Sequence, residues 1–326
     1  MSIVVIGTSF VDIKGFPLGE FIPTGRNASR IIHVHGGVAR NIAEDVAALG
    51  FETVFVTLTD GSGDSRDIVD ELRRDGVNMD YTKQSQDGLG IWLAIFNEEG
   101  DVYANMSKRP NLLPICDILE EKGDEIFSAA ESILIEIDMD DDVIKKVYEL
   151  ADKYNKDVYG CITNMTIARQ RVDYIKKTKC FVCNKLEASQ LFDEKIDSMS
   201  AKELEKILPY HLGNFGIHCM VVTLGGDGAV YAYSDGRHGY CPPEKVKPID
   251  TTGAGDAFFA GTAAYLTQGR PLDEVLPLAA VDAGELEGLR HADGDVARVD
   301  DRRVLAGGER MLAEVERIGV PCRVRT

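Results

Sequence analysis

Short apolar runs alternate with amphipathic stretches along most of the chain, and this alternation limits the fold more than any other feature. The runs VFVTLT, SILIEID and CMVVTL are short and rich in β-branched residues, as expected for strands buried on both faces of a sheet. Between such runs lie helical patterns, and in GGVARNIAEDVAALG the residues Val38, Ile42, Val46 and Leu49 recur with helical spacing. The repeat favours an α/β fold with a mainly parallel sheet covered by helices on both faces.

Two stretches interrupt this repeat, at residues 14–35 and 88–107. Both have the composition of short strands with turns, and both fall where a crossover helix would otherwise be expected. We therefore expect a small β lid inserted into a single domain that spans residues 1–326. An ordinary extension of the main sheet is the alternative.

Composition restricts the partners of the protein. The chain has 36 Lys and Arg against 54 Asp and Glu, for a net charge of −18, which argues against nucleic acid or an anionic membrane as a partner. No apolar run is long enough to span a membrane and the N-terminus lacks a secretory pattern, so we expect a cytoplasmic protein. The seven cysteines are odd in number and scattered, which favours reduced thiols. Cys180 and Cys183 should point to opposite faces of a strand as buried core thiols.

The stretch IDTTGAGDAFFAG, residues 249–261, combines small residues, a carboxylate and an apolar run. Gly253, Ala254 and Gly255 can turn their N–H groups toward one point at the start of a helix, where an anion is favoured. Asp256 would then accept a proton from a nucleophile that attacks this anion, or it would merely cap the helix. A Walker loop is excluded because no lysine follows the glycines. A dinucleotide-binding loop is excluded because Phe258 occupies the position of its third glycine.

Further polar residues fall at predicted carboxyl ends of strands, where open α/β sheets bind ligands. Asp12 is expected to end the first strand. Gly36, Gly37 and Asn41 open the following helix, where a close backbone approach and an amide suit the hydroxyls of a polyol. A tight turn with a surface asparagine is the alternative interpretation.

Two more stretches with polar residues or glycines also fall at predicted carboxyl ends of strands. Asn184 and Glu187 begin a helix directly after a strand, so Glu187 is either an ordinary acid of the first turn or a contact for hydrated Mg²⁺. The stretch VTLGGDGAV places Thr223, Gly225 and Gly228 at a strand end. Such a glycine cluster forms either a hairpin turn or a loop along a nucleotide phosphate.

Taken together and in this order, the motifs resemble those of the ribokinase-like (PfkB) carbohydrate and nucleoside kinases. HGGVARNIAEDVAALG is similar to the amino-terminal signature of that family, and DTTGAGDAFFAG matches its carboxyl-terminal signature. NKLE resembles its N-x-x-E motif and TLGGDG its nucleotide loop. The resemblance covers roughly residues 3–270.

The resemblance implies a three-layer fold with a mainly parallel sheet, a β lid that closes over substrate or forms a homodimer, and ATP with Mg²⁺ as cofactors. Asp256 would be the catalytic base, and the amides of Gly253, Ala254 and Gly255 would hold the γ-phosphate. Other roles are implied by position: substrate contacts at Asp12, Gly36, Gly37, Asn41 and Asp138; nucleotide contacts at Asn184, Thr223, Gly225 and Gly228; Mg²⁺ through water at Glu187; and, in several members of the family, K⁺ at Asp250 and Thr252.

The substrate is less constrained, because members of this family phosphorylate many small sugars and nucleosides. VDIKG at residues 11–15 and GGVARNIA at residues 36–43 resemble the pseudouridine kinase branch, and Val38 stands where ribokinases usually have lysine. Pseudouridine is therefore the preferred substrate, with ribose, fructose or a related sugar as the alternative. A non-catalytic sensor of a sugar or nucleoside is the alternative from another class, but the intact base and anion site argue against it.

The C-terminal region departs from the family from about residue 277. All 17 lysines lie at or before Lys247, whereas nine of the 19 arginines follow it. A shift of reading frame near the 3′ end of the gene would produce such a change, and a divergent native tail is the alternative.

Overall fold

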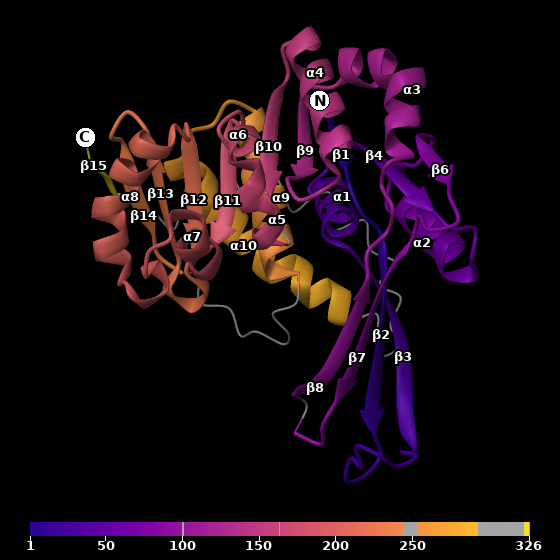
Figure 1. Ribbon diagram of the computed structural model, residues 1–326. Helices are drawn as coiled ribbons and strands as arrows, with labels where there is room; N and C mark the ends of the chain where they lie inside the picture. Colours follow the sequence, from indigo (N-terminus) through magenta and orange to yellow (C-terminus); the bar gives the residue numbers. More distant parts are fainter. Residues whose placement is uncertain (100, 163, 244–252, 293–322, 326) are drawn as a thin grey trace.

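The computed structural model describes residues 1–99, 101–162, 164–243, 253–292 and 323–325, and within them a large sheet forms the centre of the protein (Figure 1). The sheet has 11 strands in the order β15-β14-β13-β12-β11-β10-β9-β1-β4-β5, with β6 paired to β4. Pairing is parallel from β12 to β5 and antiparallel from β12 to β15. The strands are β1 Ser2–Ile6, β4 Glu52–Thr59, β5 Val77–Asn78, β6 Thr82–Gln84, β9 Ser132–Glu136, β10 Asp157–Cys161, β11 Cys180–Asn184, β12 Cys219–Thr223, β13 Ala229–Tyr233, β14 His238–Cys241 and β15 Arg323–Arg325.

Helices cover both faces of this sheet, and each face has its own apolar core (Figure 1). In β1 the side chains of Val4 and Ile6 pack on one face, whereas those of Ile3 and Val5 pack on the other. The first face is covered by α3 Ile115–Ala129, α4 Asp141–Tyr154, α7 Lys185–Phe192 and α8 Ala201–Phe215. The second is covered by α1 Val38–Ala48, α2 Gly63–Arg74, α9 Ala254–Thr267 and α10 Leu272–Ala292. The short helices α5 Met165–Ala168 and α6 Val172–Ile175 lie between β10 and β11 in the chain. The predicted three-layer α/β fold is confirmed.

The two predicted core cysteines illustrate the alternation. Cys183 belongs to the core under α3 and α4, and Cys180 to the core under α1 and α9. The thiol of Cys180 lies 3.5 Å from that of Cys219 on the neighbouring strand, and both are buried. The expectation that Cys180 and Cys183 point to opposite faces is confirmed.

A second sheet of four strands extends away from the main sheet (Figure 1). Its order is β3-β2-β7-β8, with β2 Phe10–Pro17, β3 Ser29–Gly36, β7 Gly90–Phe96 and β8 Val102–Lys108. These strands come from the two stretches in which short strands were expected, although β2 begins earlier. Movement of this sheet over a bound ligand stays a prediction.

The expectation that the first strand ends at Asp12 is wrong. Strand β1 ends at Ile6, and Asp12 lies inside β2 of the second sheet. The chain changes sheets at Thr8, whose backbone N–H and hydroxyl both donate to the buried carboxylate of Glu136. Because the residues on both sides of this break are apolar, the sequence has the appearance of one continuous strand.

The described part of the C-terminal region begins as a regular helix. Helix α10 runs without interruption past residue 277 and packs against α9. The hydroxyl of Tyr265 on α9 donates to the carboxylate of Asp282 on α10 over 2.7 Å. Residues 293–322, which form most of the atypical tail, lie outside the described residues. Within the described ranges, no helix is both long enough and apolar enough to cross a membrane.

Candidate active site

Helix α9 begins at the glycine turn of the carboxyl-terminal motif. Gly253 is the N-cap, with φ 96°, a left-handed conformation that glycine adopts readily. The first helical hydrogen bond runs from the N–H of Ala257 to the carbonyl of Gly253 over 2.9 Å. N–H groups of a first turn have no acceptor within the helix and favour an anion. Asp256 is the third residue of the helix, so it does not occupy the N-cap position.

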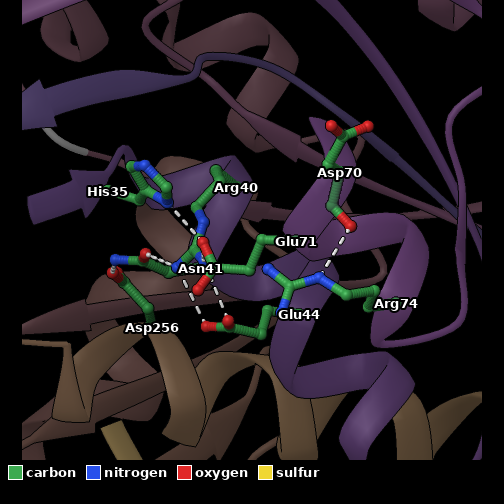
Figure 2. Close-up of polar contacts among 8 residues, drawn as sticks. All are labelled: His35, Arg40, Asn41, Glu44, Asp70, Glu71, Arg74 and Asp256. Carbon is green, nitrogen blue, oxygen red and sulfur yellow. Dashed lines mark hydrogen bonds and ion pairs between the residues drawn. The ribbon is translucent and has the colours of Figure 1, made fainter. Parts of the chain in front are cut away.

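The carboxylate of Asp256 meets the first helix of the fold (Figure 2). The side-chain amide of Asn41 on α1 donates from Nδ2 to Oδ2 of Asp256 over 2.8 Å. Asn41 was predicted to contact the substrate and Asp256 to act in catalysis. The structure brings them into direct contact.

Asp12, Gly36 and Gly37 come together where the second sheet joins the first helix. Asp12 lies on β2, and a Cβ atom on Gly36 would lie 3.0 Å from its carboxylate. Gly37 has φ 103° and is the N-cap of α1; a Cβ there would lie 2.9 Å from the carbonyl oxygen of Thr8. Gly37 therefore needs to be glycine for the backbone to pass this close, whereas a side chain at Gly36 would displace the Asp12 carboxylate. Burial raises the pKa of Asp12, and the nearby charge of Lys14 opposes this effect.

Asp138 follows β9 and is buried, with an arginine from the end of β8 beside it. Arg109 places Nη1 3.4 Å from Oδ2 of Asp138 and donates from Nη2 to its carbonyl oxygen over 2.9 Å. The ion pair compensates part of the cost of burying the carboxylate.

A second buried acid, Glu136, was not predicted as a site residue. Its Oε1 accepts hydrogen bonds from the N–H of Thr8 over 3.1 Å, the hydroxyl of Thr8 over 2.7 Å and the N–H of Ala39 over 2.9 Å. Glu136 thus stabilises the start of α1, whose N-cap Gly37 has no side chain to do so. Burial, followed by the nearby charge of Asp138, raises the pKa of Glu136 to about 7. An acid within the otherwise apolar run SILIE was the available sequence signal.

Asn184 and Glu187 form a capping box at the start of α7. Oδ1 of Asn184 accepts from the N–H of Glu187 over 2.9 Å, and Oε2 of Glu187 accepts from the N–H of Asn184 over 2.7 Å. Burial is the main cause that raises the pKa of Glu187, and the charges of Asp138 and Asp256 add to it. Glu187 therefore lies within electrostatic range of the two acids at this end of the sheet.

The residues predicted to lie along a nucleotide are adjacent to this box. Thr223 is the register partner of Asn184 across β11 and β12, and Gly225 begins a short turn that leads into β13. The N–H of Leu224 donates to the carbonyl of Gly228 over 2.8 Å, which closes a hairpin. A Cβ on Gly228 would lie only 2.2 Å from the carbonyl oxygen of Cys241. The backbone thus forms a hairpin here, and contact of these residues with a nucleotide stays a prediction. Asp250 and Thr252 lie outside the described residues.

The amino-terminal motif also holds two polar residues that were not predicted from the sequence. Arg40, directly before Asn41, contacts Glu44 on the same helix and Glu71 on α2 (Figure 2). His35 on β3 contacts the same carboxylate of Glu71. The sequence carries little signal for Arg40, because Glu44 four residues later makes it resemble half of an ordinary surface ion pair.

Comparison with known proteins identifies the family. The model of the pfkB family of carbohydrate kinases matches residues 1–284. The chain is 29% identical over 291 residues to a guanosine-inosine kinase of Exiguobacterium acetylicum. The aligned region covers 87% of this chain and 93% of that protein. It is 24% identical over 285 residues to the pseudouridine kinase of Escherichia coli, covering 85% and 87% of the two chains.

A solved structure supports the fold. Arabidopsis thaliana ribokinase, complexed with ribose and ATP, matches with a TM-score of 0.75 and 20% identity over 86% of this chain and 91% of that chain. The chain therefore belongs to the pfkB family of carbohydrate kinases. As a member of this family it is an ATP-dependent phosphotransferase that acts on a sugar or nucleoside.

Proposed function

We propose that this protein transfers the γ-phosphoryl group of ATP to a hydroxyl group of a nucleoside. The observation that carries the proposal is the contact between Asn41 and Asp256 at the start of α9, where first-turn N–H groups favour an anion. Phosphoryl transfer needs mainly in-line positioning and neutralisation of charge. The N–H groups would neutralise charge, and the contact between Asn41 and Asp256 would help to position the acceptor.

Each group would have a distinct role in the reaction. The amides of Gly253, Ala254 and Gly255 would bind the transferred phosphoryl group, and Asp256 would orient the acceptor hydroxyl and take its proton. Asp12, Gly36, Gly37, Asn41 and Asp138 would hold the other hydroxyls of the acceptor. The nucleotide would lie along Asn184, Thr223, Gly225 and Gly228.

Magnesium fits the acidic end of this site. Glu187 carries a pKa raised by burial and by the charges of Asp138 and Asp256, so a divalent cation would relieve an unfavourable accumulation of negative charge. Within the described ranges, no group of three or more His, Cys, Asp and Glu side chains could hold a metal ion directly. We propose that Glu187 acts through water on Mg²⁺, which would neutralise the phosphates of ATP. A K⁺ site at Asp250 and Thr252 remains a further proposal.

The choice of a nucleoside over a free sugar is supported by two relatives, a guanosine-inosine kinase and a pseudouridine kinase. Pseudouridine remains the first candidate because VDIKG and GGVARNIA resemble that branch and Val38 replaces the usual lysine of ribokinases. Guanosine and inosine are the second candidate, favoured by the 29% identity over 291 residues to a kinase of that name. Ribose, fructose and related sugars are the alternative.

A panel assay of ADP release tests the proposal. Pseudouridine, guanosine, inosine, uridine, adenosine, ribose and fructose are compared with Mg²⁺ in the presence and absence of K⁺, with Asp256→Asn as the background control. We expect a nucleoside to have a kcat/KM at least roughly tenfold above that of ribose. A sugar as the best acceptor would refute the nucleoside proposal. Binding of an acceptor without release of ADP would favour a sensor.

The predicted homodimer through the second sheet also stays a proposal. Several apolar side chains on its strands are exposed, among them Ile31 at 64% and Met106 at 69%. Light scattering across a range of protein concentrations would detect a dimer, and Met106→Glu should weaken it. A monomer at all concentrations would exclude this assembly.

A further inference from the structure

A buried arginine lies beside the contact between Asn41 and Asp256 (Figure 2). The side chain of Arg40 is only 4% exposed, and its guanidinium pairs with both carboxylate oxygens of Glu44 over 2.9 and 2.8 Å. Nη2 of Arg40 also lies 3.1 Å from Oε2 of Glu71 on α2. Through Nη1, Arg40 donates to Oδ1 of Asn41 over 3.2 Å. The same side chain therefore connects two carboxylates to the amide that contacts Asp256.

The chemistry of these neighbours determines how the Asn41 amide is turned. A guanidinium can only donate hydrogen bonds, so it requires the oxygen of the amide. An ionised carboxylate can only accept them, so Asp256 requires the nitrogen. Both neighbours select the same orientation. Without Arg40, the carboxylate of Asp256 alone would orient the amide, so Asn41 would be held on one side instead of two and its NH₂ group would be less precisely placed.

We propose that Arg40 is a positioning residue for the reaction, which fixes the amide of Asn41 so that its NH₂ group holds the carboxylate of Asp256. Arg40 acts through Asn41 and does not contact the acceptor. An error in the direction of the Asp256 carboxylate moves the proton acceptor away from the hydroxyl, and such displacements lower the rate more than they lower binding. The inference rests on the proposed role of Asp256 as base.

The surroundings of Arg40 explain why it can hold a fixed position. A buried cation is costly unless it is paired, and Glu44 and Glu71 supply two carboxylates. The bond to His35 and then the charge of Arg40 keep the pKa of Glu71 below its usual range, although burial opposes them. Because His35 belongs to β3, the second sheet is in contact with this network. A guanidinium held from two sides can keep its third contact, with Asn41, in one direction.

A merely structural role is the competing explanation, because Arg40 also ties α1 to α2. A double-mutant cycle separates the two. Arg40→Met is measured in the wild-type background and in Asn41→Ala, with the acceptor that gives the highest kcat/KM. We expect Arg40→Met to lower kcat about tenfold in the wild-type background, and less than about twofold when Asn41 is already absent. The KM for ATP should stay within about twofold of the wild-type value.

Controls keep this test independent of folding. Values of kcat are divided by the folded fraction from circular dichroism and by the fraction that binds ADP. Arg40→Lys retains a buried positive charge, so its kcat should fall less than that of Arg40→Met, and this loss should also vanish in Asn41→Ala. If Arg40→Met does not fold, the Arg40→Lys cycle decides the question. Arg66→Met on α2 removes an exposed guanidinium whose Nη1 donates to the backbone oxygen of Gly61 over 2.7 Å, and it should leave kcat unchanged.

Two outcomes would overturn the inference: an undiminished kcat in the Arg40 variants, or an equal loss in both backgrounds. The role of Asp256 is tested separately. If Asp256→Asn retains kcat, the assignment of the base fails. If Asp256→Asn is inactive and the Arg40 and Asn41 losses multiply, only the positioning role of Arg40 fails.

Discussion

Asn41 on α1 and Asp256 on α9 are 215 residues apart in the sequence, and their side chains are joined by a hydrogen bond of 2.8 Å. The bond connects the amino-terminal motif, in which Gly36 and Gly37 allow a close backbone approach, to the glycine turn that begins α9. The residue proposed to hold the acceptor is thereby fixed against the residue proposed to deprotonate it. Because the two side chains are in contact, the effects of mutating them should be coupled rather than additive.

Asp256→Asn should lower kcat by roughly a hundredfold or more and change the KM values little, because the carboxamide keeps the size of the side chain but accepts no proton. The measurement is steady-state ADP release with the best acceptor. Asp273→Asn is the matched control, since Asp273 is also an acid in the first turn of a helix, here α10. Similar small effects in both variants would show that Asp256 only stabilises its helix.

Gly36→Ala should reproduce the effect of Asp12→Asn, because the added Cβ would lie 3.0 Å from the Asp12 carboxylate and displace it. We expect both variants to raise the KM of the acceptor roughly tenfold and to leave the KM of ATP within about twofold. Gly15→Ala on β2, the strand that holds Asp12, is the control, since its Cβ would meet only a backbone oxygen at 3.8 Å. Equal weakening of acceptor and ATP would contradict the placement of Asp12 at the acceptor.

The general fold could be predicted because apolar periodicity reports burial directly. Strand β1 is apolar on both faces because helices cover both faces, and Val38, Ile42 and Val46 have helical spacing because α1 packs one side on the sheet. The change of sheets between Ile6 and Phe10 could not be predicted. It depends on hydrogen bonds to Glu136, which is 128 residues from Thr8.

The site could be predicted only as a set of positions. Glycine spacing indicated the start of α9, and the order of the motifs indicated the family. Sequence spacing does not reveal which side chains meet, so the contact of Arg40 with Asn41 and Glu71 depended on the packing of α1 against α2. The burial of Glu136 under the first turn of α1 likewise depended on tertiary structure.

The stability of the protein should depend on pH through Glu136. Its pKa of about 7 lies above the ordinary value of 4.5, so the folded state holds the proton more tightly than the unfolded state. The stabilisation that this proton binding gives to the folded state is complete below about pH 4.5 and is lost as pH rises through 7. The variant Glu136→Gln cannot ionise but can still accept from Thr8 and Ala39. Relative to this variant, the free energy of unfolding of the wild-type protein should fall by on the order of 1–3 kcal/mol across this pH window. Urea unfolding at several pH values measures it, and parallel curves for both proteins would refute it.

The change of composition after Lys247 predicts a defect in the C-terminal region if it arises from a shifted reading frame. The family match ends at residue 284, and α10 continues as a helix to Ala292. A single-base correction near codons 271–280 that encodes a family-like ending should lower the KM of ATP, by roughly tenfold, and raise the melting temperature. Sequencing the gene comes first. If no alternative frame encodes such a helix, the tail is native.

Glu187 has two proposed effects, helix capping and attraction of Mg²⁺. One substitution can remove the second effect and keep the first. Glu187→Gln preserves the capping box, because glutamine can accept from the N–H of Asn184 as glutamate does, but it removes the charge. We expect the Mg²⁺ concentration for half-maximal activity to rise about fivefold to tenfold, while the melting temperature changes little.

Glu203→Gln is the matched control for this measurement. Glu203 forms the same kind of capping box with Ser200 at the start of α8, where its Oε2 accepts from the N–H of Ser200 over 2.8 Å. Both substitutions remove one negative charge and keep one cap. Hydrogen bonds from Ser200 lower the pKa of Glu203, whereas burial raises the pKa of Glu187, so Glu203→Gln should lower stability more than Glu187→Gln. Only the variant at Glu187, whose pKa is raised by burial and by Asp138 and Asp256, should alter the response to Mg²⁺. An unchanged Mg²⁺ dependence in Glu187→Gln would leave Glu187 with the capping role alone.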